Sequence, residues 1–136
     1  MNEKELCSKA VEAMGKAYAP YSKHKVGAAL LTETGRLFTG CNIENAAYSP
    51  TVCAERVALF TAVAAGERKF KAIAVAGGKD GIIDGAFPPC GVCRQVMAEF
   101  CSPDFIILVV TGNNSFKKYT LSELLPEAFT PENIES

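Results

Sequence analysis

Three cysteines and their spacing point to a metal site in this sequence. Cys90 and Cys93 are three residues apart, so on a helix they lie on one face within chelating distance of each other. Cys53 precedes an alanine-rich segment that reads as a helix, and the helix dipole at such a start favours the thiolate, the form that binds metal. Three thiolates suit Zn²⁺, which prefers four tetrahedral ligands. We therefore predict one zinc ion per chain, bound by Cys53, Cys90 and Cys93.

Glu55 and Arg56 follow Cys53 closely and favour a site that performs chemistry. Residues 53 and 55 are about 200° apart around an ideal helix, so both reach one centre only if it lies beyond the N-terminal end. Glu55 would then contact a water at the fourth zinc position without being a ligand, which is where a proton shuttle is needed. Arg56 would offset part of the negative charge that three thiolates leave on the zinc centre.

Two other interpretations of the cysteines stay open. A redox motif also consists of two cysteines separated by two residues at a helix start, as are Cys90 and Cys93. This interpretation leaves Cys53 unexplained. A structural zinc module, a binding protein without chemistry, would need a fourth protein ligand, for which His24 or Cys41 would serve. If the zinc site is catalytic, the remaining cysteines behave as small apolar residues, and we expect Cys7, Cys41 and Cys101 in the core.

The segments that position these residues alternate between helical and strand patterns. Helices are expected at residues 3–18, 53–65, 88–100 and 121–125, and strands at 26–32, 36–41, 70–76, 105–110 and 116–119. All six positions of 105–110 are apolar, so both faces of that strand should be covered. Residues 77–87 are rich in glycine and form a loop. The order predicts an α/β fold, a three-layer α/β/α domain with a mixed five-stranded sheet.

Length and composition predict one domain over residues 1–136. It begins with the N-terminal helical region in 1–20 and ends with a C-terminal tail at 127–136. Apolar residues make up 49% and charged residues 21%, close to an average globular domain. The net charge of −1 disfavours a nucleic-acid partner, which requires a basic face. No apolar run approaches the ~20 residues of a membrane span, and the polar N-terminus predicts no secretory signal. We expect a cytoplasmic protein without membrane contact.

Beyond the zinc motif, long runs of the chain resemble one enzyme family. Cys53-Ala54-Glu55 followed by Pro89-Cys90-Gly91-Val92-Cys93 resembles the signature of the zinc-dependent nucleobase and nucleoside deaminases. Four further runs are similar to the short homotetrameric cytidine deaminases: YAPYS at 18–22, VGAA at 26–29, GCNIENAAYS at 40–49 and LLPEAF at 124–129. The resemblance covers nearly the whole chain.

This resemblance implies a cytidine deaminase-like fold and the hydrolysis of cytidine and 2′-deoxycytidine to uridine, 2′-deoxyuridine and ammonia, as in pyrimidine salvage. Zinc would activate the water that attacks C4 of cytosine, and Glu55 would carry protons to N3 and to the ammonia. The backbone N–H of Ala54 would hold the base O2, and the carbonyl of Pro88 would accept from the amine.

The same resemblance assigns the remaining substrate contacts. Asn42, Ile43 and Glu44 correspond to the segment that binds the ribose hydroxyls. Ala46, Tyr48 and Phe129 match positions that complete a neighbouring subunit's pocket, so a homotetramer with shared sites is implied and a monomer would lack a finished site.

Two features depart from the family pattern. His24 stands near the base where the family usually has phenylalanine, and the loop at 77–87 is a few residues longer than usual. His24 together with Thr51-Val52 also resembles the blasticidin S deaminases, which lack the ribose-type run that is intact here. Deamination of a modified cytosine nucleoside such as blasticidin S is therefore the alternative activity.

Overall fold

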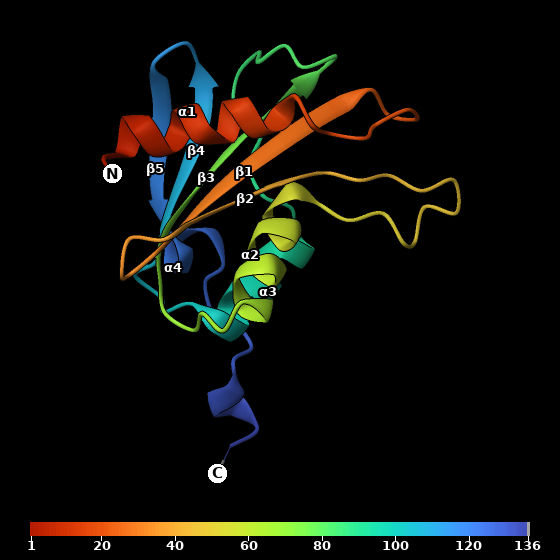
Figure 1. The fold of residues 1–136 in the computed structure, drawn as a ribbon. Helices are drawn as coiled ribbons and strands as arrows, with labels where there is room; N and C mark the ends of the chain where they lie inside the picture. The colour runs from red at the N-terminus through yellow and green to blue at the C-terminus, as the bar shows by residue number, and fades with distance from the viewer. Residues whose placement is uncertain (136) are drawn as a thin grey trace.

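The computed structural model describes residues 1–135 and is built around one five-stranded sheet (Figure 1). The strands are β1 His24–Thr32, β2 Leu37–Cys41, β3 Phe70–Lys79, β4 Ile106–Gly112 and β5 Ser115–Thr120. Their order is β2-β1-β3-β4-β5, with β3 and β4 parallel and the other neighbouring pairs antiparallel. The predicted mixed sheet of five strands is confirmed.

Helices cover both faces of the sheet and give three layers (Figure 1). Helix α1 (Glu3–Met14) packs on one face, where Leu31 and Leu108 belong to its cluster of buried residues. Helices α2 (Ala54–Ala64) and α3 (Gly91–Phe100), with the short α4 (Leu121–Leu124), pack on the other face over Leu30 and Ile73. Successive side chains of a strand point to opposite faces, which is why neighbours such as Leu30 and Leu31 join different clusters.

Strand β4 confirms the prediction that the apolar run at 105–110 forms a strand covered on both faces. It lies between β3 and β5, and the side chains of Ile107, Leu108 and Val109 are fully buried. A short 3₁₀ turn at Pro131–Asn133 follows in the C-terminal segment. Within residues 1–135, no helix is long and apolar enough to cross a membrane.

Two elements end three or four residues away from the predicted position. Helix α1 stops at Met14 and not at residue 18, because the backbone of Tyr18 instead exchanges hydrogen bonds with Asn42 and Glu44. Strand β3 continues to Lys79, three residues into the expected loop, because it keeps its pairing with β1 as far as His24. Both differences come from backbone partners that are distant in sequence.

Two glycines let helices lie directly on the sheet. A Cβ atom on Gly40 of β2 would lie 2.5 Å from the carbonyl oxygen of Ala54 and 2.6 Å from the nitrogen of Ala58, both in α2. On the opposite face, a Cβ on Gly27 of β1 would lie 2.1 Å from the carbonyl oxygen of Ala10 in α1. The contact at Gly40 sets the height of the first turn of α2 above the sheet.

We predict that Gly40→Ala destabilises the fold by about 1–3 kcal/mol, the range for overpacking a close contact, and also weakens zinc binding. The added methyl group meets backbone that cannot yield without moving the start of α2. Thermal unfolding and metal content would measure the two effects. Gly27→Ala is the matched control, since it should destabilise through α1 and leave zinc bound. Equal metal retention in both variants would contradict the link between Gly40 and the zinc site.

Candidate metal centre and active site

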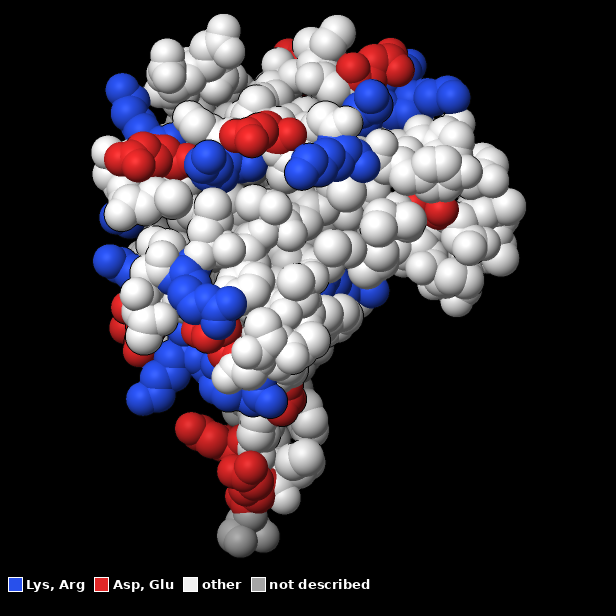
Figure 2. Space-filling view, in the orientation of Figure 1, with Lys and Arg blue, Asp and Glu red and all other residues white. Residues whose placement is uncertain are grey.

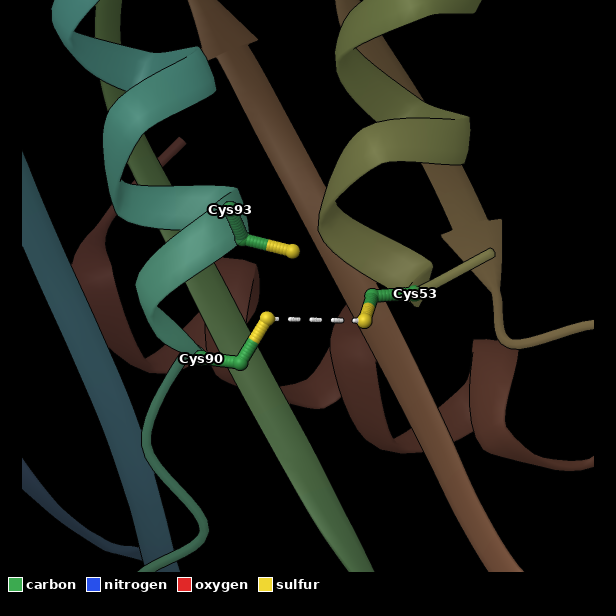
Figure 3. Close-up of side chains that lie close together, drawn as sticks. All are labelled: Cys53, Cys90 and Cys93. Carbon is green, nitrogen blue, oxygen red and sulfur yellow. Dashed lines mark hydrogen bonds between the residues drawn. The ribbon is translucent and has the colours of Figure 1, made fainter. Parts of the chain in front are cut away.

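The sulfur atoms of Cys53, Cys90 and Cys93 converge between the first turns of α2 and α3 (Figure 3). All three atoms lie within 4.8 Å of one another, and those of Cys53 and Cys90 are 3.7 Å apart. Cys53 is the N-cap of α2 and Cys90 the N-cap of α3, while Cys93 is buried one turn further. All three cysteines are free thiols. The sequence prediction that these side chains share one centre agrees with this geometry.

The spacing fits a zinc ion. With Zn–S bonds of about 2.3 Å, sulfur ligands at the corners of a tetrahedron are ~3.8 Å apart, close to the distance between Cys53 and Cys90. In the described part of the chain the group consists of the three cysteines. Cys41 Sγ instead donates to the carbonyl of Lys16 at 3.3 Å, and His24 Nδ1 donates to the carbonyl of Ser22 at 3.0 Å. The arrangement leaves a fourth position for a ligand that is not protein, as in catalytic zinc sites.

Electrostatics prepares Cys53 for metal binding. Hydrogen bonds from Cys93, then from Arg56 and Cys90, lower the pKa of the Cys53 thiol to about 5 although burial opposes the shift. The pKa of Cys93 moves upward because its thiol donates to Cys53. Arg56 Nη2 lies 3.4 Å from Cys53 Sγ, so the guanidinium is placed to balance thiolate charge. The charge balance predicted for Arg56 would act through this contact.

Glu55 is a carboxylate enclosed by the fold. Its side chain is only 4% exposed, and burial raises its pKa to about 7, with the charge of Cys53 adding to the shift. A carboxyl group with such a pKa exchanges protons readily near neutral pH, which suits a general acid and base. It lines the same cavity as Cys53 and Cys90.

That cavity has a volume of about 440 Å³, a size appropriate for a small molecule. Seven residues selected from the sequence line it: His24, Asn42, Glu44, Cys53, Glu55, Pro88 and Cys90. Ala54 is buried beside it as the first residue of α2, a position whose N–H has no partner within the helix.

Asn42 and Glu44 tie two distant segments together at one side of the cavity. The side chain of Asn42 accepts from the Val26 N–H at 2.9 Å and donates to the His24 carbonyl at 2.8 Å. Glu44 accepts from the backbone N–H of Tyr21 and from both the N–H and the hydroxyl of Ser22. These hydrogen bonds, chiefly that of the Ser22 hydroxyl, lower the pKa of Glu44 and keep it ionised.

Four other predicted substrate residues lie away from the lining of the cavity. Ile43, Tyr48 and Phe129 have exposed side chains, with Tyr48 75% and Phe129 60% accessible, and Ala46 is also exposed. Tyr48 lies in the loop between β2 and α2 and has a positive φ of 59°. Within one chain they do not complete this pocket.

Phe87 also lines the cavity, and it was not among the residues selected from the sequence. Its ring lies over Gly77, where a Cβ atom would be 1.9 Å from Cδ1 of Phe87. Ser22, Val26, Thr51 and Val52 also line the cavity. The glycine-rich loop that ends at Phe87 also holds Ile82 and Ile83, so the sequence pattern did not distinguish Phe87.

Arg94 does not line the cavity but contacts the loop that leads to the zinc ligand Cys90. Its Nε donates to the carbonyl of Pro89 at 2.7 Å and its Nη1 to that of Leu124 at 2.8 Å. The next residue, Gln95, donates to the carbonyl of Phe129 at 2.8 Å. The loop before Cys90 is thereby joined to the C-terminal segment. Of the remaining cysteines, Cys7 is buried, whereas Cys41 and Cys101 are only partly buried.

The fold and this three-cysteine centre define a zinc-binding deaminase domain. Residues 1–109 match the cytidine and deoxycytidylate deaminase zinc-binding region, and the chain belongs to that enzyme family. A redox motif or a structural zinc module therefore does not account for the cysteines.

Particular relatives are similar over nearly the full chain. A cytidine deaminase of Sporosarcina psychrophila is 46% identical over 134 residues, covering 98% of this chain and 96% of that protein. The crystal structure of cytidine deaminase from Burkholderia pseudomallei superposes with a TM-score of 0.88 at 46% identity, covering 95% of this chain and 100% of that one. A blasticidin-S deaminase of Bacillus cereus is 35% identical over 130 residues, covering 93% and 91%.

Purified protein is expected to carry close to one zinc per chain, and Cys90→Ser should lose it. A serine hydroxyl is a poor zinc ligand, so we expect apparent affinity to fall by at least about tenfold. Atomic emission after equilibration with a competing chelator measures the retained metal. Cys41→Ser is the control, because Cys41 bonds a backbone carbonyl outside the group. Full zinc retention by Cys90→Ser would contradict the assigned ligand set.

Proposed function

We propose that this chain hydrolyses cytidine and 2′-deoxycytidine to uridine and 2′-deoxyuridine, releasing ammonia. The observation that carries the proposal is the buried Glu55 beside the three-cysteine centre, in a cavity that also presents Asn42 and Glu44. Water replaces the exocyclic amine at C4, so one C–O bond forms as the C–N bond breaks. Membership of the deaminase family supports this reaction.

Residues around the centre of the cavity would orient the base. The first N–H of α2, on Ala54, is free within the helix and would donate to O2 of the pyrimidine. The carbonyl of Pro88, which lines the cavity, would accept from the exocyclic amine. Glu55 then faces N3. It would take one proton from the attacking water and deliver it to N3, and then take the second and deliver it to the C4 amine, which leaves as ammonia.

Zinc held by Cys53, Cys90 and Cys93 supplies, when bound, the Lewis acid that activates the water for attack. Arg56 offsets the thiolate charge through its contact with Cys53 and so keeps the centre electrophilic. The enclosure of Glu55 strengthens its interactions with the developing charge because little water screens them.

The sugar would lie against Asn42 and Glu44, with the backbone of Ile43 between them. Each carboxylate oxygen can accept more than one hydrogen bond, so Glu44 keeps acceptor capacity for a ribose hydroxyl beside its bonds to Tyr21 and Ser22. Since those bonds fix the carboxylate beforehand, little side-chain entropy is lost on binding.

Glu55→Gln should keep the fold and zinc but lower kcat by about 10²- to 10⁴-fold, the range for removing a general acid–base group. The amide has the same shape and cannot take up or deliver the proton. Loss of ultraviolet absorbance by cytidine measures turnover, and metal analysis verifies zinc. Glu99→Gln, an exposed glutamate on α3, is the control with unchanged turnover. Near-normal activity of the Glu55 variant would remove its proposed role.

A modified cytosine nucleoside is the second candidate substrate. The similarity to the Bacillus cereus blasticidin-S deaminase and the position of Thr51 and Val52 in the cavity lining favour its inclusion in assays. Parallel kinetics with cytidine, deoxycytidine, free cytosine and blasticidin S distinguish the two. The ribose-side pair Asn42 and Glu44 favours the plain nucleosides.

We also propose a homotetramer in which Ala46, Tyr48 and Phe129 complete a neighbouring subunit's pocket. The loop between β2 and α2 protrudes from the body of the molecule and carries few charged side chains (Figure 2). An aromatic side chain 75% exposed on backbone with positive φ, as at Tyr48, is unfavourable for an isolated chain. A partner's surface would give these aromatic side chains apolar contacts.

Light scattering should give a particle of four times the chain mass. Mixing two inactive variants tests sharing directly. Under the proposal, a pocket that takes Glu55 from a Phe129→Ala subunit and Phe129 from a Glu55→Gln subunit carries neither defect. If Phe129 acts on a neighbour, reassembled mixtures contain intact sites and regain activity that neither parent has. A fully active monomer would contradict the shared site.

We infer that residues 1–136 act as one catalytic domain in the cytoplasm, in pyrimidine salvage, with a nucleoside as the partner. The balance of fourteen basic and fifteen acidic residues supports the absence of a nucleic-acid partner.

A further inference from the structure

A second cavity adjoins the catalytic pocket. Its volume is about 460 Å³, close to the 440 Å³ of the pocket itself, and the two share His24 and Phe87 in their linings. Glycines and the backbone at the end of β3 form much of the second cavity, together with Ile82 and the following loop. The two spaces are therefore neighbours, with these two aromatic side chains at their boundary.

The boundary consists of side chains that the fold holds in place. The rings of His24 and Phe87 lie 5.9 Å apart and are tilted by 51°. His24 is fixed by Ser22, whose carbonyl accepts from Nδ1 and whose hydroxyl accepts from the His24 N–H, both at 3.0 Å. Phe87 occupies the space left by the missing side chain of Gly77.

The loop that forms the second cavity is held in place independently of these rings. The loop after β3 folds back so closely that a Cβ on Gly78 would lie 1.8 Å from the carbonyl oxygen of Ile82. The N–H of Asp80 donates to the carbonyl of Lys23 at 2.6 Å, which joins this loop to the segment before β1. Replacing either aromatic side chain by a smaller one would consequently connect the two cavities and leave the loop that forms the second cavity in place.

We propose that His24 and Phe87 set the size limit for substituents at C5 of the cytosine ring, the second cavity being the space they close off. The inference rests on the proposed function for the orientation of the base. With N3 at Glu55 and the exocyclic amine at the Pro88 carbonyl, C5, which is bonded to the amine-bearing C4, lies on the Pro88 side of the base. Phe87 directly precedes Pro88 and lines the same cavity together with His24. A large C5 group then collides with the rings, while a small one fits beside them.

The test compares kcat/KM for cytidine with that for cytidines carrying methyl, iodo and phenyl groups at C5. The wild-type ratio should fall steeply with substituent size, reaching about tenfold to a hundredfold against the phenyl compound, as expected for steric exclusion. His24→Ala and, independently, Phe87→Ala should raise the phenyl-to-cytidine ratio at least about tenfold. His24→Phe retains a ring and should keep the wild-type limit.

Ile82→Ala is the matched control, since it enlarges the second cavity without touching the boundary, and its ratio should equal that of wild type. Equal use of all C5 compounds by wild type would overturn the proposal even if a variant failed to fold. So would unchanged ratios in folded, zinc-loaded His24→Ala and Phe87→Ala. Failure of the wild type to deaminate cytidine would instead overturn the proposed function.

Discussion

The site depends on one geometric constraint: the N-termini of two helices must meet over the same part of the sheet. Helix α3 joins the parallel strands β3 and β4, a crossover whose handedness places it on the face already covered by α2. Because a cysteine is the N-cap of each helix, this packing brings the sulfur atoms to 3.7 Å (Figure 3). The positive ends of both helix dipoles then stabilise the thiolates.

The buried glutamate follows from the same packing. Gly40 lets α2 lie against β2, and this close approach leaves Glu55 only 4% exposed. Burial of a carboxylate costs stability unless it is protonated or paired, so its pKa rises to about 7. The enclosure that is unfavourable for folding is what adjusts the carboxyl group for proton transfer.

Hydrogen bonds between segments distant in sequence hold the wall of the cavity in shape. Asn42 and Glu44 bind the backbone of residues 21–26, and Ser22 in that segment fixes the ring of His24. The residues proposed to bind ribose therefore also position His24, another side chain of the cavity wall. A change at Glu44 would act on both, through Ser22.

The sequence by itself determined the elements and the ligand set, because both depend on local spacing. Cysteines three apart on a helix, a cysteine before a helix start and six consecutive apolar residues carry their meaning within one segment. Only the tertiary structure decided where α1 ends, how long β3 is, and that the ring of Phe87 packs on Gly77 in the cavity wall. Each depends on a partner distant along the chain, whose approach is set by how the whole sheet and its helices pack.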